Sequence, residues 1–440
     1  MAGDTGVKPS DIESTTMSKV TWRLVPFLML CYFIAFLDRV NVGFAGASMR
    51  ADLDLSATAF GGAAGIFFIA YFFFEVPSNL ALHAFGARRW IARIMFTWGL
   101  ISGAQAFVTG ELSFNIVRLL LGMAEAGFFP GIIFFLTLWF PTAYRARIVG
   151  WFMFAIPIST VIGAPISGLV LGLEGVGGLH GWQWMFLIEA FPALIMTFAV
   201  LHYLTDRPVD AKWLKPEERE WLQGRLDRER AEREAILDLS WFRSMLDWRV
   251  IALGLVYMGC NIPQYGLSFF LPQIVKAFGV SNLTAGFITA VPYLVGAIGM
   301  VAWGAHSDRT GERKWHAAIA FLFIIAGLGL ASTTDDPAIK MLLLCVAGFG
   351  FFAVLPIFWT LPTAFLSGAG AAAGIAAVNS IGNLGGYFGP QAFGLLRDYT
   401  GADVTGLVFL AGCAFVGMVI VLLLGYNPAI SRNLAATTAG

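Results

Sequence analysis

Two adjacent ionisable residues interrupt a long apolar stretch near the start of the chain. Residues 27–47 read FLMLCYFIAFLDRVNVGFAGA, with Asp38 and Arg39 in the middle of the run and Asn41 close behind. A charge at the centre of a bilayer costs at least ~3 kcal/mol on insertion scales. A membrane span therefore rarely carries such a pair without a use for it. We expect both side chains to face a protein interior or a hydrated cavity.

A second charged set lies in the apolar stretch 112–139. Arg118 and Glu125 are two helical turns apart, so they share one helix face with Gly122 between them and lie roughly 10 Å apart along the axis. At ~1.5 Å per residue, Asp38 lies ~22 Å into its span and Arg118 ~9 Å from the opposite surface. These depths coincide in a hydrocarbon core ~30 Å thick. We therefore predict that Asp38 can pair with Arg118, with Glu125 nearer the midplane.

One arginine beside two carboxylates in a medium of low dielectric makes the proton affinity of the acids sensitive to an arriving anion. Such a site can couple the movement of a proton to that of an anion. The alternative is a buried salt bridge that serves packing alone. Buried ion pairs often contribute little stability, so four ionisable groups in two spans favour the functional interpretation.

Other polar residues inside apolar stretches carry a weaker signal. Tyr71 is as consistent with a substrate contact as with an ordinary core tyrosine, and Glu75 is expected to pair with arginines of a nearby loop. Glu189 has no assigned role. The second half of the chain offers only neutral groups within its spans, which are Asn261, Gln264, Tyr265, Trp359, Thr360, Asn379, Ser380 and Asn383. This asymmetry assigns charge handling to the first half and neutral hydrogen bonding of a substrate to the second.

The composition is that of a polytopic membrane protein. Of the 440 residues 58% are hydrophobic and 13% charged, against ~25% charged in soluble domains. The formal net charge of zero argues against a nucleic-acid partner, because no basic excess exists to neutralise phosphates. The four cysteines lie in apolar runs and are interpreted as small buried hydrophobes. Residues 1–20 are polar and lack the features of a cleavable signal peptide.

Twelve stretches are long and apolar enough to span a bilayer, which requires roughly 20 residues each. Six precede and six follow the charged segment 206–248, whose mixed charges at helical spacing predict a linker helix on the membrane surface. The predicted organisation is an N-terminal tail (1–22), a six-helix bundle (23–205), the linker (206–248), a second six-helix bundle (249–426) and a C-terminal tail (427–440). The predicted spans are 23–47, 57–82, 88–108, 112–139, 148–172, 182–205, 249–275, 284–304, 315–332, 340–362, 371–396 and 405–426.

Sequence repeats indicate that the two bundles are copies of one unit. Gly86-x-Arg88-Arg89-Trp90 recurs as Gly311-x-Arg313-Lys314-Trp315, and Ala164-Pro165 recurs as Gly389-Pro390, each with an offset of 225 residues. Because six spans return the chain to its starting side, the copies are parallel repeats. Lys and Arg residues concentrate on the side of the termini and the linker, so we predict that this side is cytoplasmic.

The loop after the eighth span carries a specific motif, Gly304-x-x-x-Asp308-Arg309-x-Gly311-x-Arg313-Lys314. It resembles the signature loop of the major facilitator superfamily. The corresponding loop after the second span departs from it, with His83 and Ala84 in place of the acidic and basic residues. Within that superfamily, three further stretches resemble the anion:cation symporter family, in its branch of bacterial tartrate-like and hydroxyphenylacetate-like permeases. They are Asp38-Arg39-x-Asn41-x-Gly43, Glu75-Val-Pro77-Ser-Asn79 and Arg118-x-x-x-Gly122-x-x-Glu125-Ala-Gly127.

This resemblance implies an all-α membrane protein with twelve transmembrane helices in two pseudo-symmetric bundles, working by alternating access. It implies that Asp38 and Glu125 exchange protons, that Arg39 holds a substrate carboxylate and that Arg118 tunes the acids. A gating role is implied for Asp308, Arg309, Gly311 and Arg313. Tyr71, Trp359 and Asn379 fall where relatives line the substrate cavity.

We therefore expect a secondary transporter that imports a small organic anion with protons, such as a hydroxy-dicarboxylate, a sugar acid or an aromatic acid. An exporter or an uncoupled facilitator of the same fold is the main alternative. An enzyme is disfavoured, since the five histidines and scattered serines form no metal or nucleophile–base pattern. The expected partners are the anion, protons and the lipid bilayer, with no further cofactor. A monomer in the bacterial inner membrane with both termini cytoplasmic is expected.

Overall fold

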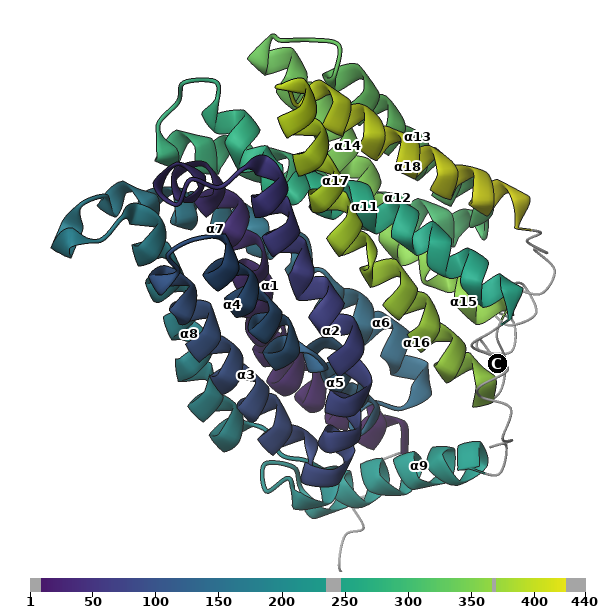
Figure 1. The fold of residues 1–440 in the computed structure, drawn as a ribbon. Coiled ribbons are helices and arrows are strands. Elements are labelled where there is room, and N and C mark those ends of the chain that lie inside the picture. Colours follow the sequence, from purple (N-terminus) through teal and green to yellow (C-terminus); the bar gives the residue numbers. More distant parts are fainter. Residues whose placement is uncertain (1–8, 235–246, 366–368, 425–440) are drawn as a thin grey trace, which may run out of the picture.

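The protein is an all-helical bundle in the computed structural model, which describes residues 9–234, 247–365 and 369–424 (Figure 1). The described residues contain no strand. The helices of the first half are α1 (Pro9–Asp52), α2 (Ala57–Phe85), α3 (Ala87–Ala104), α4 (Glu111–Glu125), α5 (Phe128–Thr137), α6 (Thr142–Met153), α7 (Ala155–Val170) and α8 (Gly181–Tyr203). The linker contains α9 (Pro216–Glu234). The helices of the second half are α11 (Trp248–Lys276), α12 (Asn282–Thr310), α13 (Lys314–Ala331), α14 (Pro337–Phe358), α15 (Thr360–Phe365), α16 (Ala369–Asn383), α17 (Gly385–Thr400) and α18 (Val404–Leu423).

Each predicted span coincides with one helix or with two consecutive helices. In the described part of the chain, ten helices or helix pairs are long and apolar enough to cross a membrane. The two further predicted spans correspond to α3, whose first turn carries Arg88 and Arg89, and to α16–α17. The four cysteines are free. Cys31 and Cys260 are buried as expected from the sequence, whereas Cys345 and Cys413 are partly exposed.

The fourth span is divided just after the functional candidate Glu125. Helix α4 ends there and α5 begins at Phe128, because Gly127 adopts the left-handed conformation with φ 85°. A side chain at Gly127 would also collide with Ser78 of α2, so this position requires glycine for both backbone angle and space. Two spans of the second half are divided as well, at Trp359 between α14 and α15 and at Leu384 between α16 and α17.

Reciprocal helix contacts confirm the duplicated architecture. Gly61 of α2 packs against the backbone of Pro390 in α17, and Gly286 of α12 packs against the backbone of Ala164 and Pro165 in α7. Gly286 follows Gly61 by 225 residues, and Pro390 follows Pro165 by 225, the offset of the sequence repeat. The same contact is therefore made twice, once from each half, as an axis of pseudo-symmetry between the halves requires.

The two halves are joined most firmly at the end of the molecule opposite α9. Asp398 of α17 accepts hydrogen bonds from the first backbone N–H groups of α2, those of Ala57 and Thr58, at 3.0 and 2.6 Å. Arg50 at the end of α1 donates to the Gln273 side chain of α11 at 3.1 Å. Further hydrogen bonds that join the halves are one from the Thr58 hydroxyl to Asp398 at 2.6 Å, one from Asn282 to the Leu171 carbonyl and one in mid-molecule, discussed below.

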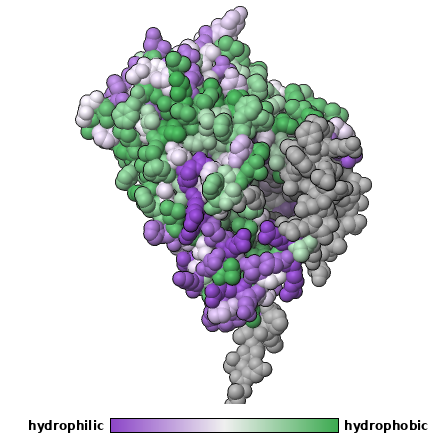
Figure 2. All heavy atoms as spheres, turned by 60° about the horizontal axis from the view of Figure 1, so that its bottom comes forward, coloured by the Kyte–Doolittle hydropathy of each residue, from purple (hydrophilic) through white to green (hydrophobic). Residues whose placement is uncertain are grey.

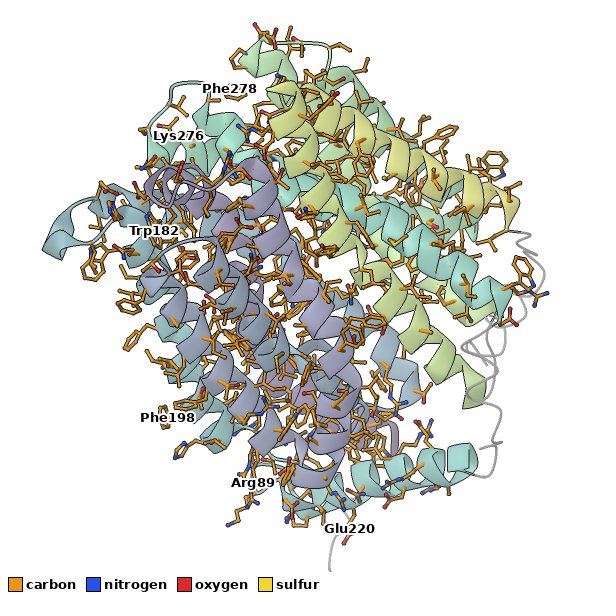
Figure 3. The ribbon with its side chains drawn as sticks, viewed as in Figure 1. Arg89, Trp182, Phe198, Glu220, Lys276 and Phe278 are labelled. Carbon is orange, nitrogen blue, oxygen red and sulfur yellow. The ribbon has the colours of Figure 1, made fainter. Side chains whose placement is uncertain are left out.

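Hydrophobic side chains cover the flanks of the bundle. Phe198 of α8 is 61% exposed there, as expected for a side chain that faces lipid. Charged side chains lie toward the ends, with Arg89 and Glu220 near the α9 end and Lys276 at the opposite end (Figure 3). Viewed from the α9 end, hydrophilic side chains gather around that helix while the flanks remain mostly apolar (Figure 2). This distribution suits a protein whose belt is immersed in a bilayer.

Helix α9 is fastened to the first half. Glu218 pairs with Lys19 of α1 at 2.6 Å, and Glu229 pairs with Arg145 of α6 at 3.5 Å. Glu229 also accepts a hydrogen bond from the Thr142 backbone N–H at 3.0 Å, at the first residue of α6. The predicted linker helix is therefore present and lies across the ends of helices from the first half.

Candidate functional site

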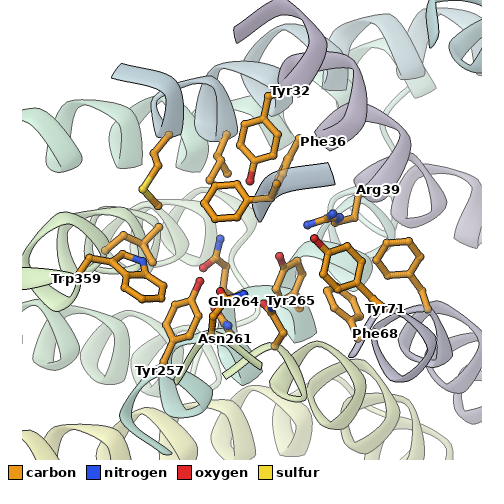
Figure 4. A pocket seen from close by; sticks show the side chains of 17 residues that line it. Tyr32, Phe36, Arg39, Phe68, Tyr71, Tyr257, Asn261, Gln264, Tyr265 and Trp359 are labelled. Carbon is orange, nitrogen blue, oxygen red and sulfur yellow. The ribbon is translucent and has the colours of Figure 1, made fainter. Parts of the chain in front are cut away.

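A cavity lies between the two halves, midway along the bundle (Figure 4). Its space, including the part open to solvent, amounts to about 620 Å³. Nine of its 17 lining residues are aromatic, four carry amides, three are aliphatic and one is an arginine. They are Tyr32, Phe36, Arg39, Phe67, Phe68, Tyr71, Phe129, Met153, Ile156, Tyr257, Asn261, Gln264, Tyr265, Leu355, Trp359, Asn379 and Asn383.

Packed rings separate this cavity from the end of the molecule opposite α9. Phe68 of α2 meets Tyr265 of α11 with ring centroids 4.5 Å apart, and Phe60 meets Phe270 at 5.8 Å. Both pairs join the two halves, and Phe60 and Phe270 lie between the cavity and the interhelical contacts of Arg50 and Asp398. The cavity is therefore sealed on that side by both apolar and polar contacts.

Arg39 is the cationic group of the cavity wall. It stands on α1 and is 8% exposed, and its Nη2 donates to Glu125 Oε1 in a buried ion pair. Its guanidinium also lies 5.3 Å from the ring centre of Phe67 and 5.6 Å from that of Tyr71. Aromatic faces attract a cation and restrict its motion, so the fork of Arg39 is held in place at the edge of the cavity.

Glu125 lies behind Arg39, away from the cavity lining, and is 1% exposed. As the last residue of α4, it occupies the point where Gly127 turns the chain away from the helix axis. The basic partner of Glu125 is Arg39, which comes from another helix, α1. An anion that binds Arg39 would compete directly with the Glu125 carboxylate for the same guanidinium.

The predicted pairing of Asp38 with Arg118 is wrong. Asp38 Oδ2 accepts a hydrogen bond from the indole Nε1 of Trp98 in α3 at 2.7 Å. Arg118 Nη2 donates to the carbonyl oxygen of Ala64 in α2 at 2.9 Å. The depth argument ignored direction around the helix axis. Neighbouring residues of a helix point about 100° apart. Because Arg39 points toward the cavity and Glu125, the adjacent Asp38 points toward α3 instead.

Arg118 nevertheless lies close to the Arg39–Glu125 pair. It is fully buried, and its guanidinium lies 5.0 Å from the ring centre of Phe67, whose ring also lies near Arg39. Its Nη1 has no hydrogen-bond partner in the described part of the chain. Arg118 thus adds a fixed positive charge behind Glu125 without reaching the cavity.

Glu75 also departs from the prediction. It was expected to pair with loop arginines, but its Oε1 accepts a hydrogen bond from the Asn379 side chain of α16 at 3.1 Å, and it is 6% exposed. The loop arginines are not its partners because the Glu75 side chain points from α2 toward the second half rather than along the helix to its end. Asn379 of the cavity wall is therefore the residue that links the halves in mid-molecule.

Glu189, to which the sequence gave no role, is a buried acid of the first half. Its Oε1 accepts a hydrogen bond from the Ser167 hydroxyl of α7 at 2.6 Å, and it is 2% exposed. It does not line the cavity. Its position inside an apolar span was a signal of importance, but its partner lies in a different span and no spacing in the sequence connects the two.

Four predicted substrate residues, Arg39, Tyr71, Trp359 and Asn379, all line the cavity. The predicted proton-exchanging acids Asp38 and Glu125 lie behind its wall. Sequence reasoning missed the cavity role of Tyr32, Phe36 and Tyr257. Aromatic residues in an apolar span resemble core residues, so no signal in the sequence could have separated them.

The predicted gating residues lie apart from the cavity, where α12 ends and α13 begins. Asp308 and Arg309 belong to the last turn of α12, and Gly311 and Arg313 lie in the short loop that follows. Arg313 Nη1 pairs with Asp308 Oδ1 at 2.7 Å, and Gly311 adopts a positive φ of 66° that ends α12. Arg309 is exposed. The structure thus brings two of the four residues into contact and explains the glycine by its backbone angle.

The described residues contain no group of three His, Cys, Asp or Glu side chains that could hold a metal ion. What the cavity offers is one guanidinium for an anion, several neutral hydrogen-bonding groups and aromatic faces. Two six-span halves around such a cavity define the molecule as a polytopic membrane transporter of the alternating-access type of fold.

Residues 28–390 match the family described as Major Facilitator Superfamily, and the chain belongs to that superfamily. It is similar to an Agrobacterium vitis protein named "Putative tartrate transporter", with 52% identity over 95% of this chain and 93% of the relative. It is 39% identical to the Escherichia coli inner membrane transport protein RhmT, over 93% and 95% of the two chains. These relatives fit the anion:cation symporter branch. The chain is a transporter and not an enzyme.

Solved structures show the same fold. The Escherichia coli xylose transporter XylE, in a partially occluded inward open conformation, matches with a TM-score of 0.72 at 16% identity, over 93% of this chain and 98% of XylE. A bacterial homologue of the human lysosomal transporter Spinster, inward-facing and unoccupied, matches with a TM-score of 0.71 at 19% identity over 98% of both chains.

Proposed function

We propose that this transporter imports a small organic anion together with protons across the bacterial inner membrane. The observation that carries the proposal is the buried Arg39–Glu125 ion pair at the wall of the central cavity. A substrate carboxylate that takes one side of the Arg39 fork removes the counter-charge from Glu125. A buried carboxylate without a cation takes up a proton rather than remaining charged. Anion binding and proton uptake then favour each other.

The other acids and the second arginine have separate parts in this scheme. Asp38, held by Trp98, is a second proton-exchanging group of the first half. Arg118 lies behind Glu125 and limits how readily that acid takes a proton, because a nearby positive charge favours the carboxylate. Arg39 faces the cavity and binds the substrate, and Tyr71, Trp359 and Asn379 complete the binding surface around it.

The proposed orientation assigns the two ends of the molecule to the two sides of the membrane. We infer from the basic residues of the linker and the loops that α9 and both termini lie in the cytoplasm. The contacts of Asp398 and Arg50 then close the periplasmic side, and the cavity is sealed toward the periplasm. The chain functions as a monomer, with the cavity built entirely from its own two halves. No cofactor other than the proton is required.

Transport by the full-length protein in liposomes tests the proposal. An imposed pH gradient, acidic outside, should drive uptake of a radiolabelled carboxylate above its external concentration, and a protonophore should abolish the accumulation. An uncoupled facilitator would only equilibrate the anion, and an exporter would accumulate it when the gradient is reversed. Failure of every carboxylate in a broad panel to move would refute the assignment to organic anions.

A further inference from the structure

The cavity is poor in positive charge. Among its 17 lining residues Arg39 is the one ionisable group other than tyrosine, and its charge is already balanced by Glu125. Arg118, the nearest second arginine, is fully buried and donates to backbone carbonyls of α2. The cavity therefore presents a single site at which a carboxylate can meet a cation.

The wall opposite Arg39 is polar but neutral. Trp359 lies on the far side of the cavity from Arg39, and Gln264 lies between the two in this view (Figure 4). The indole Nε1 of Trp359 is buried and has no hydrogen-bond partner within the described residues. Gln264 and Asn383 also line the cavity and add neutral amide groups to it. Unpaired polar groups in a binding site select ligands that satisfy them.

We propose that the substrate is a hydroxylated monocarboxylate, of the sugar-acid type, and not a dicarboxylate. The carboxylate binds Arg39, and hydroxyl groups further along the substrate accept from Trp359 and exchange hydrogen bonds with Gln264 and Asn383. A second carboxylate at that wall would be buried among neutral groups without a cation, which is unfavourable. A plain aromatic ring would leave the indole N–H unpaired. This inference rests on the proposed function, whose site it specifies.

Two matched pairs of probes isolate the second carboxylate. Threonate and tartrate differ only in a terminal hydroxymethyl against a carboxylate, and gluconate and glucarate differ in the same way at greater length. Initial uptake rates of the radiolabelled acids are measured in liposomes that contain the full-length protein, near neutral external pH, where both carboxyl groups are ionised. In at least one pair, the monocarboxylate should have a kcat/KM about tenfold or more above its partner, equivalent to about 1.4 kcal/mol.

Two variants test the opposite wall directly. Trp359→Phe removes the N–H but keeps an aromatic ring, and it should raise the KM for the preferred monocarboxylate about tenfold. Trp248→Phe is its control, because Trp248 is 64% exposed and lies outside the cavity. Gln264→Arg adds a second cation and should shift the ratio of dicarboxylate to monocarboxylate uptake upward by about tenfold. If this variant fails to fold, Trp359→Phe still tests the assignment.

The outcomes separate the inference from the function on which it rests. Equal or faster uptake of a dicarboxylate in both pairs, or faster uptake of 4-hydroxyphenylacetate than of every sugar acid, overturns the inference and leaves carboxylate transport intact. An unchanged KM in Trp359→Phe removes the indole from the recognition of hydroxyl groups and contradicts the inference. If none of these carboxylates is transported by the folded protein, the proposed function itself fails.

Discussion

The two halves share one architecture but differ in chemistry. The first half contributes every described acid and arginine buried in mid-bundle: Asp38, Arg39, Glu75, Arg118, Glu125 and Glu189. The second half contributes amides, tyrosines and one tryptophan to the same cavity. Helix contacts duplicated at one offset therefore do not imply duplicated function. Proton exchange can proceed within one half, whose internal packing need not change, while the substrate contacts both halves and senses their separation.

Removal of the acid from the ion pair should have the largest effect. Glu125→Gln keeps the size of the side chain but cannot lose a proton. We expect this variant to lose proton-driven accumulation in liposomes and to retain exchange of internal for external substrate, because Arg39 stays in the cavity. Accumulation at the level of the original protein would show that coupling resides elsewhere, with Asp38 as the next candidate.

Loss of the arginine should weaken binding strongly. In Arg39→Ala the substrate carboxylate meets no cation, and Glu125 is left buried without its partner, a loss of about 2–5 kcal/mol for comparable pairs. We expect the affinity for the carboxylate to fall at least about 30-fold, as measured by ligand-induced thermal stabilisation. Arg39→Lys keeps the positive charge but not the forked guanidinium. Its affinity for the carboxylate should lie between those of the original protein and Arg39→Ala. Unchanged affinity in Arg39→Ala would exclude this residue from the substrate site.

A change in the neutral half should alter affinity and spare coupling. Asn379→Leu removes the hydrogen bond to Glu75 and one polar group of the cavity wall. We expect the KM for uptake to rise about threefold to tenfold, the effect of one lost neutral hydrogen bond. Substrate should still accumulate under a pH gradient. Loss of accumulation in this variant, with binding intact, would contradict the division of labour between the halves.

The contact between the halves at Asp398 should have a smaller effect. Asp398→Ala leaves the N–H groups of Ala57 and Thr58 without this acceptor, and loss of a comparable helix cap costs about 1 kcal/mol. The closed arrangement should therefore lose about fivefold in population relative to the alternative. Spin labels at the exposed positions Asp54 and Ala402 should report longer distances in the variant. An unchanged distance distribution would show that ring packing alone holds this end closed.

The exposed pair His180–Glu174 of the first half should differ from the buried charges of that half in having no effect on transport. The hydrogen bond that the His180 ring donates to the Glu174 carboxylate raises the pKa of His180 above its usual value of 6.5. The interaction is therefore strongest at low pH and is lost as pH rises through that raised pKa. Glu174→Gln should lower the pKa of His180, as followed by NMR titration of the ring. Transport should stay unchanged, since this pair is exposed and far from the cavity. A large loss of transport would refute that separation.

The sequence was sufficient for the architecture and for the residues that face the cavity. The spans, the linker helix and the repeat follow from apolar length, charge and motif spacing. The cavity positions of Arg39, Tyr71, Trp359 and Asn379 were expected from the resemblance to the anion:cation symporter family. The partners of the buried charges did not follow. Depth along a helix is set by residue number, but direction around it depends on packing, so Asp38 was paired with Arg118 when it faces Trp98.

Contacts between spans set a second limit on prediction. Glu75 meets Asn379 from the other half, and Glu189 meets Ser167 from a neighbouring span, and neither pairing has a counterpart in local spacing. The aromatic lining was hidden for a different reason. Tyr32 and Tyr257 lie in apolar spans, as do many core aromatic residues. They differ from core residues only in that they line the cavity between the halves.

The attachment of α9 to the first half offers a way to watch the molecule work. Because Glu218 and Glu229 bind this helix to α1 and α6, α9 should move together with the first half as one rigid body. A fluorophore at the exposed Glu220 and an acceptor at the exposed Thr310 of α12 would then register the separation of the two halves. Single molecules labelled in this way would show, in real time, whether adding substrate and lowering the pH together change how long the halves remain apart.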